Sequence, residues 1–231
     1  MFRKILRRTL SASGFTDFPH CPSQTDMPKT HHRSHTFHHG KPATATLYTH
    51  KFIYAAYTTL CEVFFMKHLK YTMIIGALFV LIAGSLSHFL YDWTGQNTVV
   101  GLFAPVNESI WEHMKLLFFP MLLYSLIILF LYGRKTPCLA SSLCFGIIVG
   151  TLLIPVLFYA YTAVLGKNIF LLDIGTFILS VLAAFLLSCR FTLSCRLKPY
   201  TFPLCLLVGI FFLCFLRFTY HPPALKIFES P

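Results

Sequence analysis

Charged side chains are scarce in this chain: of its 231 residues only 12% are Asp, Glu, Lys or Arg, whereas 56% are hydrophobic. Soluble domains usually carry about twice that charged fraction, so the composition argues against a soluble domain. The 8 acidic residues face 19 Lys and Arg, which gives a formal net charge of +11. No nucleic-acid-binding motif accompanies this basic excess, and basic residues beside membrane helices usually report orientation instead.

Several catalytic and cofactor-binding signatures are also missing. The sequence contains no P-loop and no motif for a nucleophilic serine, which argues against ATP-driven transport by this chain alone. Its 8 cysteines form no Cys-x-x-Cys pair, and Cys144, Cys205 and Cys214 fall inside apolar runs, where a thiol behaves as a small hydrophobe. This pattern predicts neither a disulfide framework nor a zinc ribbon.

Long apolar runs dominate the second part of the chain. A helix of about 20 apolar residues spans about 30 Å of hydrocarbon and satisfies its own backbone hydrogen bonds. The runs therefore predict an all-α fold, a polytopic membrane helical bundle whose partner is the lipid bilayer and not nucleic acid. The five expected transmembrane spans cover residues 71–91, 109–132, 139–165, 169–189 and 202–220.

Residues 1–65 differ from the rest, since they are rich in His, Thr, Ser and Pro and have no sustained helical or strand period. We interpret them as a disordered or dispensable N-terminal extension, and residues 66–231 as the transmembrane helical domain. Residues 1–15 are rich in Arg and free of acids, as transit peptides are. Met66-Lys67-His68-Leu69-Lys70, by contrast, is typical of the start of a bacterial membrane protein. The histidine-rich stretch 31–39 could bind a metal ion loosely, but nothing in the sequence orders its ligands.

Lys and Arg residues near the ends of the spans predict the orientation. Cytoplasmic loops carry an excess of these residues, and seven fall on one predicted side against four on the other. We therefore expect a cytoplasmic N-terminus and a C-terminus outside, in a bacterial cell membrane. The seven are Lys67, Lys70, Arg134, Lys135, Arg190, Arg196 and Lys198, and the four are Lys115, Lys167, Arg217 and Lys226.

Acids and histidines gather at the outer ends of the predicted spans. His88 and Asp92 are four residues apart and share a helical face with Gly84, so His88 is expected to point into the bundle. The second span opens with a capping-box pattern at Ser109, for which Asn107 is a rival cap. The candidate polar cluster consists of His88, Asp92, Asn107, Glu108, Glu112 and His113, and Asp173 could join it.

Two interpretations of this cluster remain open. In the functional one, the side chains converge into a pocket in the outer half of the bundle, where they could hold zinc, relay protons or bind a cationic group. In the structural one, Glu108 and Glu112 cap a helix, Glu112 pairs with Lys115, Asp92 faces solvent, and His88 hydrogen-bonds a backbone carbonyl.

Two long motifs and a late segment carry a family resemblance. They are Ser87-His88-Phe89-Leu90-Tyr91-Asp92-Trp93-Thr94-Gly95-Gln96-Asn97, then Phe103-Ala104-Pro105-Val106-Asn107-Glu108-Ser109-Ile110-Trp111-Glu112-His113-Met114-Lys115, and Tyr220-His221-Pro222-Pro223-Ala224-Leu225-Lys226-Ile227-Phe228. With them, residues 66–231 resemble a family of small multi-pass bacterial integral membrane proteins of unknown function. The resemblance implies a membrane location and a bacterial setting but no activity, and it leads us to expect a few more residues beyond the C-terminal end.

The segment from Asn107 to His113 is also similar to the Asn-Glu-Thr-x-Asn-Ile-Trp-Thr-His motif of the progestin and adipoQ receptors, which resemble zinc-binding membrane hydrolases. The second Asn of that motif and a late pair of histidines are absent here. These observations leave three hypotheses. The protein binds or helps to move a small ligand or ion at an outer polar pocket; or it is a membrane-embedded metal-dependent hydrolase of a lipid-like substrate that uses His88, Glu112 and His113; or it is a structural or partner-binding subunit.

Overall fold

A computed structural model describes the backbone of residues 43–134 and 136–229, and the side chains of this part from residue 67 onwards. The described residues are mostly helical and contain no strand. The predictions for residues 1–42, including the transit-peptide-like start and the histidine-rich stretch 31–39, lie outside the described residues.

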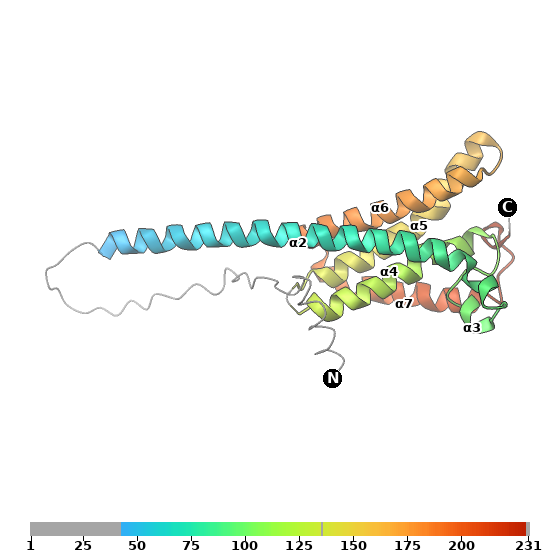
Figure 1. Ribbon diagram of the computed structural model, residues 1–231, viewed down its shortest axis with the longest axis horizontal. Helices are drawn as coiled ribbons and strands as arrows, with labels where there is room; N and C mark the ends of the chain where they lie inside the picture. The colour runs from blue at the N-terminus through green and yellow to red at the C-terminus, as the bar shows by residue number, and fades with distance from the viewer. Residues whose placement is uncertain (1–42, 135, 230–231) are drawn as a thin grey trace. The chain divides into compact units, whose positions relative to one another are not determined.

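Five long helices and three short ones make up the described chain (Figure 1). Each long helix contains a stretch that is long and apolar enough to cross a membrane, which confirms the predicted all-α bundle with five spans. The elements are α2 (Ala43–Trp93), α3 (Thr98–Gly101), α4 (Ile110–Tyr132), α5 (Leu139–Leu165), α6 (Phe170–Ser194), η2 (Lys198–Tyr200), α7 (Thr201–Phe218) and η3 (Lys226–Phe228).

Helix α2 begins at Ala43, well before the predicted start of the first span at residue 71. Residues 43–65, where the sequence predicted no regular structure, are therefore helical. No Pro or Gly interrupts the chain between Pro42 and Gly76, so nothing local ends the helix.

The chain divides into two compact units between Leu69 and Lys70, and the second unit, Lys70–Pro231, contains the membrane bundle. The predicted division after residue 65 stays a prediction.

Small residues, among them Gly146 and Gly150, bring α5 and α6 together. A Cβ atom on Gly146 would overlap the Ser188 hydroxyl and lie 2.7 Å from the Ala184 carbonyl oxygen. A Cβ atom on Gly150 would lie 2.7 Å from the Ala184 Cβ atom. The hydroxyl of Ser188 donates across the same contact to the carbonyl oxygen of Ser142, at 3.2 Å. Close backbone approach of this kind is how membrane helices gain packing contacts.

Helix α2 packs against α4 and α6 through two further glycines. A Cβ atom on Gly84 would lie 2.5 Å from the Leu116 carbonyl oxygen of α4 and 2.7 Å from the Phe177 ring of α6. Gly76 lies in the same way against the rings of Tyr124 and Phe185. The face of α2 that carries Gly84 therefore points into the bundle, as predicted, and His88 follows one turn later on that face.

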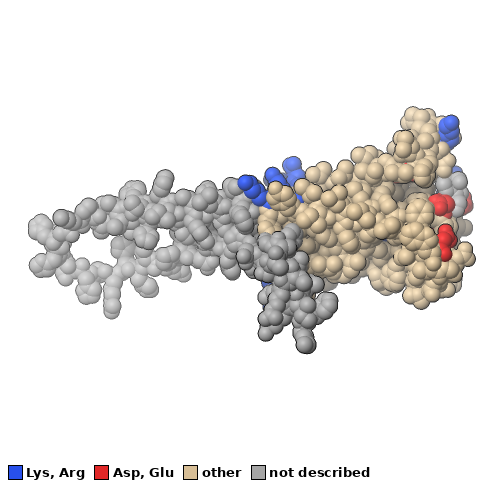
Figure 2. All heavy atoms as spheres, viewed as in Figure 1, with Lys and Arg blue, Asp and Glu red and all other residues tan. Residues whose placement is uncertain are grey.

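The alternating direction of the helices puts the acids of the second unit at one end and most of its Lys and Arg residues at the other (Figure 2). We call residues 88–115, 161–173 and 217–229 the acidic end, and residue 70 with residues 132–134, 136–139 and 190–201 the basic end. All five acids of the predicted membrane domain belong to the acidic end. They are Asp92, Glu108, Glu112, Asp173 and Glu229.

The basic end contains a disulfide bond between Cys138 and Cys195, which are 57 residues apart. The prediction that the cysteines form no disulfide was wrong for this pair. Because α5 and α6 form an antiparallel hairpin, the residues just before α5 and just after α6 meet, and no local spacing in the sequence reveals this. Between α5 and α7, the thiol of the buried Cys144 lies 3.3 Å from that of the exposed Cys205.

Candidate functional site

Two histidines and one carboxylate meet at the acidic end. His88 lies near the end of α2, Glu108 lies in the loop before α4, and His113 lies in the first turn of α4. The Nε2 atoms of His88 and His113 lie 3.7 Å and 3.4 Å from the same Glu108 oxygen, Oε2. One ligand atom from each residue lies within 4.8 Å of the other two, so the three could hold a metal ion.

The backbone of α4 sets the orientation of the His113 ring. Its Nδ1 atom lies 2.9 Å from the carbonyl oxygen of Ser109. Because a carbonyl oxygen can only accept, this hydrogen bond requires the hydrogen on Nδ1, and the neutral ring then presents the Nε2 lone pair to Glu108. The rings of His88 and His113 meet edge to face, with centroids 5.3 Å apart.

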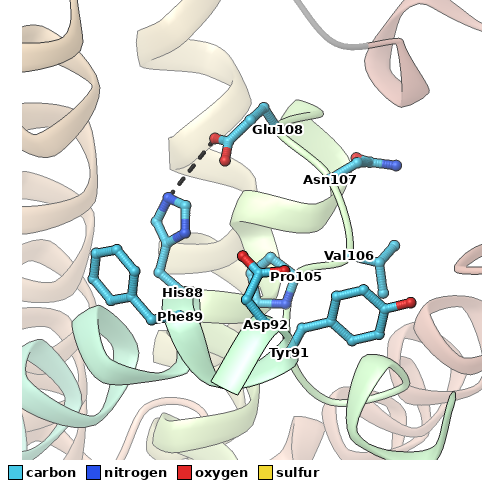
Figure 3. A pocket seen from close by; sticks show the side chains of 8 residues that line it. All are labelled: His88, Phe89, Tyr91, Asp92, Pro105, Val106, Asn107 and Glu108. Carbon is cyan, nitrogen blue, oxygen red and sulfur yellow. Dashed lines mark ion pairs between the residues drawn. The ribbon is translucent and has the colours of Figure 1, made fainter. Parts of the chain in front are cut away.

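A cavity of about 140 Å³ opens beside this group, between the end of α2 and the loop before α4. Figure 3 shows the Glu108 carboxylate pointing towards His88, while the Asn107 amide points away from both. The side chains of His88 and Glu108 are 29% and 66% exposed, so the cavity is open to the exterior. The lining residues are His88, Phe89, Tyr91, Asp92, Pro105, Val106, Asn107 and Glu108.

The start of α4 explains why Glu108 stays in the loop. Ser109 is the N-cap, and its hydroxyl oxygen accepts the backbone N–H of Glu112 at 3.4 Å. In a complete capping box the Glu112 carboxylate would accept the Ser109 N–H in return. Here the side-chain oxygen of Asn107 accepts that N–H instead, at 2.9 Å. Asn107 is thus a positioning residue for the loop.

Glu112 belongs to a buried ion pair. The Lys115 ammonium lies 2.7 Å from Glu112 Oε2, and the two side chains are 0% and 3% exposed. The same ammonium donates to the Gly101 carbonyl oxygen at 3.1 Å and to the Thr219 hydroxyl at 2.6 Å. Glu112 Oε2 also accepts the backbone N–H of Val106, at 3.0 Å. The pair therefore ties together α3, the loop before α4, α4 itself and the end of α7.

This ion pair separates Glu112 from the role that the hydrolase hypothesis gave it. The pairing with Lys115 is what the structural interpretation expected, and Glu108 meets the two histidines where Glu112 was proposed as a ligand. Consecutive residues of a helix point about 100° apart. Since His113 faces His88, its neighbour Glu112 faces another direction.

The segment after α7 closes over the start of α4. The Tyr220 hydroxyl donates to the Thr98 carbonyl oxygen at 2.8 Å. Burial raises the pKa of Tyr220, and the nearby Tyr91 and Glu112 raise it further, so the phenol remains a donor. The Trp111 ring packs against Phe228 of η3, with ring centroids 4.8 Å apart. The late segment thus helps to hold the helix that carries His113.

The two remaining predicted acids have different surroundings. Asp92 lies exposed in the last turn of α2 and lines the cavity without joining the group of three. Asp173 lies in the first turn of α6, where its carboxylate accepts a hydrogen bond from the Tyr161 hydroxyl. The structure therefore does not bring Asp173 into the cluster.

The sequence did not predict that Lys115 donates hydrogen bonds to Gly101 and Thr219. The available signal was that a charged residue within a span needs a buried acceptor, and it indicated Glu112, three residues away. No pattern in the sequence indicates Thr219, which lies 104 residues further along the chain.

No curated protein and no solved structure matches this chain. A family model described as a family of unknown function (DUF6512) matches residues 62–231. The matched region contains the whole second unit and every residue of the group around Glu108. Together with the five apolar helices, it agrees with the resemblance to multi-pass membrane proteins of unknown function. The chain belongs to the DUF6512 family.

Proposed function

We propose that this protein is a multi-pass protein of the bacterial cell membrane that binds a small cation in the cavity at its acidic end. In the proposed orientation the N-terminus is cytoplasmic and the C-terminus and the cavity lie outside. One observation carries the proposal: the carboxylates of Asp92 and Glu108 and the imidazole of His88 line a single open cavity of about 140 Å³.

The charges around the cavity favour a cation. Asp92 and Glu108 supply two negative charges to its lining. The nearby Lys115 does not offset them, because its ammonium is buried against Glu112. A cleft lined by charges of one sign concentrates counter-ions from solution, and interactions beside the low-dielectric bundle are stronger than in bulk water.

The loop that carries Glu108 is held on both sides, which also favours a binding site. Upstream, the Val106 N–H is bound by Glu112, and downstream, the Ser109 N–H is bound by Asn107. A binding group held in place by its supporting shell loses less freedom when the ligand arrives. Glu108 is exposed enough, at 66%, to receive a ligand.

Thermal unfolding of the full chain in lipid nanodiscs tests the proposal, with Na⁺, K⁺, Mg²⁺, Ca²⁺, Zn²⁺ and tetramethylammonium as probes. A cation that binds only the folded state stabilises it by about 2.7 kcal/mol at a hundred times its Kd. We expect one of these ions to stabilise the wild type, and the variant Asp92→Asn/Glu108→Gln to lose that effect.

The matched control is Glu229→Gln, which removes an exposed acid of the same end that does not line the cavity. It should respond to the ion as the wild type does. If no cation stabilises the wild type, or if the double variant responds equally, the cavity is not a cation site. The structural or partner-binding role would then be favoured.

A metal-dependent hydrolase is the second candidate. It is favoured by the group His88, Glu108 and His113 beside an open cavity. A metal ion bound by this group would activate water and polarise carbonyl groups. Hydrolysis of a lipid-like ester by the zinc-supplemented protein, lost in Glu108→Gln, would support it. If the protein binds the ion and cleaves no ester, the hydrolase candidate fails and only the binding function stands.

A further inference from the structure

We infer that the cation is a transition metal of the Zn²⁺ class, held by Nε2 of His88, Oε2 of Glu108 and Nε2 of His113. The inference rests on the proposed function, because two of the three ligand residues, His88 and Glu108, line the same cavity. It names the kind of ion and the ligand atoms, neither of which follows from the charge of the cavity alone.

The separations of Glu108 Oε2 from the two histidine nitrogens suit a shared metal better than direct hydrogen bonds. Bonds from zinc to nitrogen or oxygen measure about 2.0–2.2 Å, so neighbouring ligands of a tetrahedral ion lie about 3.3–3.6 Å apart. The two separations from Glu108 Oε2 are 3.4 Å to His113 and 3.7 Å to His88. A good N–H···O hydrogen bond would bring the atoms to about 2.7–3.2 Å.

The hydrogen bond behind His113 is of the kind found behind metal-bound histidines. A ligating histidine usually donates its other ring N–H to a carbonyl or carboxylate, which fixes the ring and the tautomer. In this protein the acceptor is the Ser109 carbonyl oxygen, 2.9 Å from Nδ1. Ser109 is also the N-cap of α4, so the fold sets the acceptor before any ion binds.

The chemistry of the ligands selects the kind of metal. Mg²⁺ and Ca²⁺ prefer ligand sets made of oxygen atoms, whereas imidazole nitrogens suit zinc and its neighbours in the first transition series. Two of the three ligands here are imidazoles. The site should therefore bind Zn²⁺ in preference to the hard divalent ions.

The cavity supplies an open position on the metal. Three protein ligands leave a tetrahedral ion one further position, as in zinc sites that exchange water or substrate. His88 and Glu108 border the cavity, and Asp92 lines it as well. The charges of Glu108 and Asp92 together match the two positive charges of the ion. We therefore assign the site to an exchangeable metal and not to a closed structural one.

Metal binding to the full chain, purified without a histidine tag and stripped with a chelator, tests the inference. Zn²⁺ binding is measured by titration calorimetry, and Co²⁺ is added as a visible-absorption probe of tetrahedral coordination. The histidines of the stretch 31–39 set a background, which the variant His88→Ala/His113→Ala measures. We expect the wild type to bind one more Zn²⁺ than this variant, and to give a tetrahedral Co²⁺ spectrum that the variant lacks.

Single variants distinguish the three proposed metal ligands from other residues of the acidic end. Glu108→Gln should weaken binding by at least the roughly 10–100-fold that loss of a second-shell partner causes. His221→Ala, which removes an exposed histidine of the same end outside the group, should bind as the wild type does. Since Glu108 is exposed in its loop, its variant keeps the test valid even if the histidine variants fail to fold.

Equal zinc binding by the wild type and its ligand variants would overturn the inference. If another cation then still stabilises the protein through Asp92 and Glu108, the proposed function stands and only the identity of the ion is wrong. If no cation binds, both the proposed function and the inference about the metal are wrong.

Discussion

The two ends of the membrane bundle use ionisable side chains in opposite ways. At the basic end the described Lys and Arg residues are all exposed, and the feature that joins elements there is the bond between Cys138 and Cys195. At the acidic end one Lys and one Glu are buried against each other, while the exposed Asp92 and Glu108 line an open cavity. Exposed Lys and Arg residues can set the membrane orientation from many positions of a loop. A buried charge, by contrast, needs specific partners close to it.

The largest effect on this difference between the two ends is expected from a substitution of Lys115. We expect Lys115→Met to destabilise the protein by about 3–5 kcal/mol, because it leaves Glu112 buried without its counter-charge. Chemical unfolding in detergent, followed by the fluorescence of Trp111 and Trp93, measures the change. The matched control, Lys198→Met at the basic end, removes an exposed charge and should stay within about 0.5 kcal/mol of the wild type.

A double variant, Lys115→Met/Glu112→Leu, tests the reason for this loss. Replacing both partners of a buried pair by apolar residues is often close to neutral. We therefore expect it to recover part of the stability that Lys115→Met loses. If it is no more stable than the single variant, the packing of the lysine stem and not the charge pair is what matters.

The disulfide provides the second test, and it also tests the orientation. Removing it by Cys138→Ser/Cys195→Ser should destabilise the oxidised protein by about 2–4 kcal/mol, as loss of such a link typically does. The proposed orientation puts this end in the cytoplasm, where thiols are kept reduced. Alkylation of intact cells before lysis should then find both thiols free. A bond already formed in those cells would contradict the proposed orientation.

The contact between α5 and α6 gives a smaller effect. Gly146→Ala should destabilise the protein by about 1–3 kcal/mol through overpacking, because the added carbon would lie 2.7 Å from the Ala184 carbonyl oxygen. Gly175→Ala is the control, since a Cβ atom on Gly175 meets nothing within 4 Å. Unfolding midpoints of the two variants should move apart, and equal midpoints would show that α6 yields at this contact.

The smallest expected effect concerns Tyr220. Tyr220→Phe removes the hydrogen bond to the Thr98 carbonyl oxygen and should destabilise the protein by about 0.5–1.5 kcal/mol. Because folding raises the pKa of this phenol, the folded state holds its proton more tightly than the unfolded state. The stability difference between wild type and variant is therefore full below pH about 10, the ordinary tyrosine value, and shrinks at higher pH.

Unfolding curves of both proteins between pH 8 and pH 11 measure that difference. The shared titration of the other tyrosines cancels when the variant is subtracted from the wild type. A difference that grows with pH would contradict the assigned direction.

Much of the candidate site could be predicted from the sequence, and the part that could not has a clear cause. Helical spacing predicted that His88 faces the bundle and that Ser109 caps α4, because both depend on residues within one or two turns. The choice between Glu108 and Glu112 as partner of the histidines depended on where Lys115 finds its other acceptors. One of these, Thr219, comes from the far end of the chain.

The sequence by itself determined that residues 66–231 form a bundle of five apolar helices, with the acids of this region at one end and the excess of Lys and Arg at the other. Both properties follow from the length of apolar runs and from where charges interrupt them, which local chemistry sets. Only the tertiary structure decided that His88, Glu108 and His113 meet, that Glu112 is buried against Lys115, and that Cys138 reaches Cys195. Each of these contacts joins segments whose distance depends on how the helices pack, and a sequence pattern does not encode that packing.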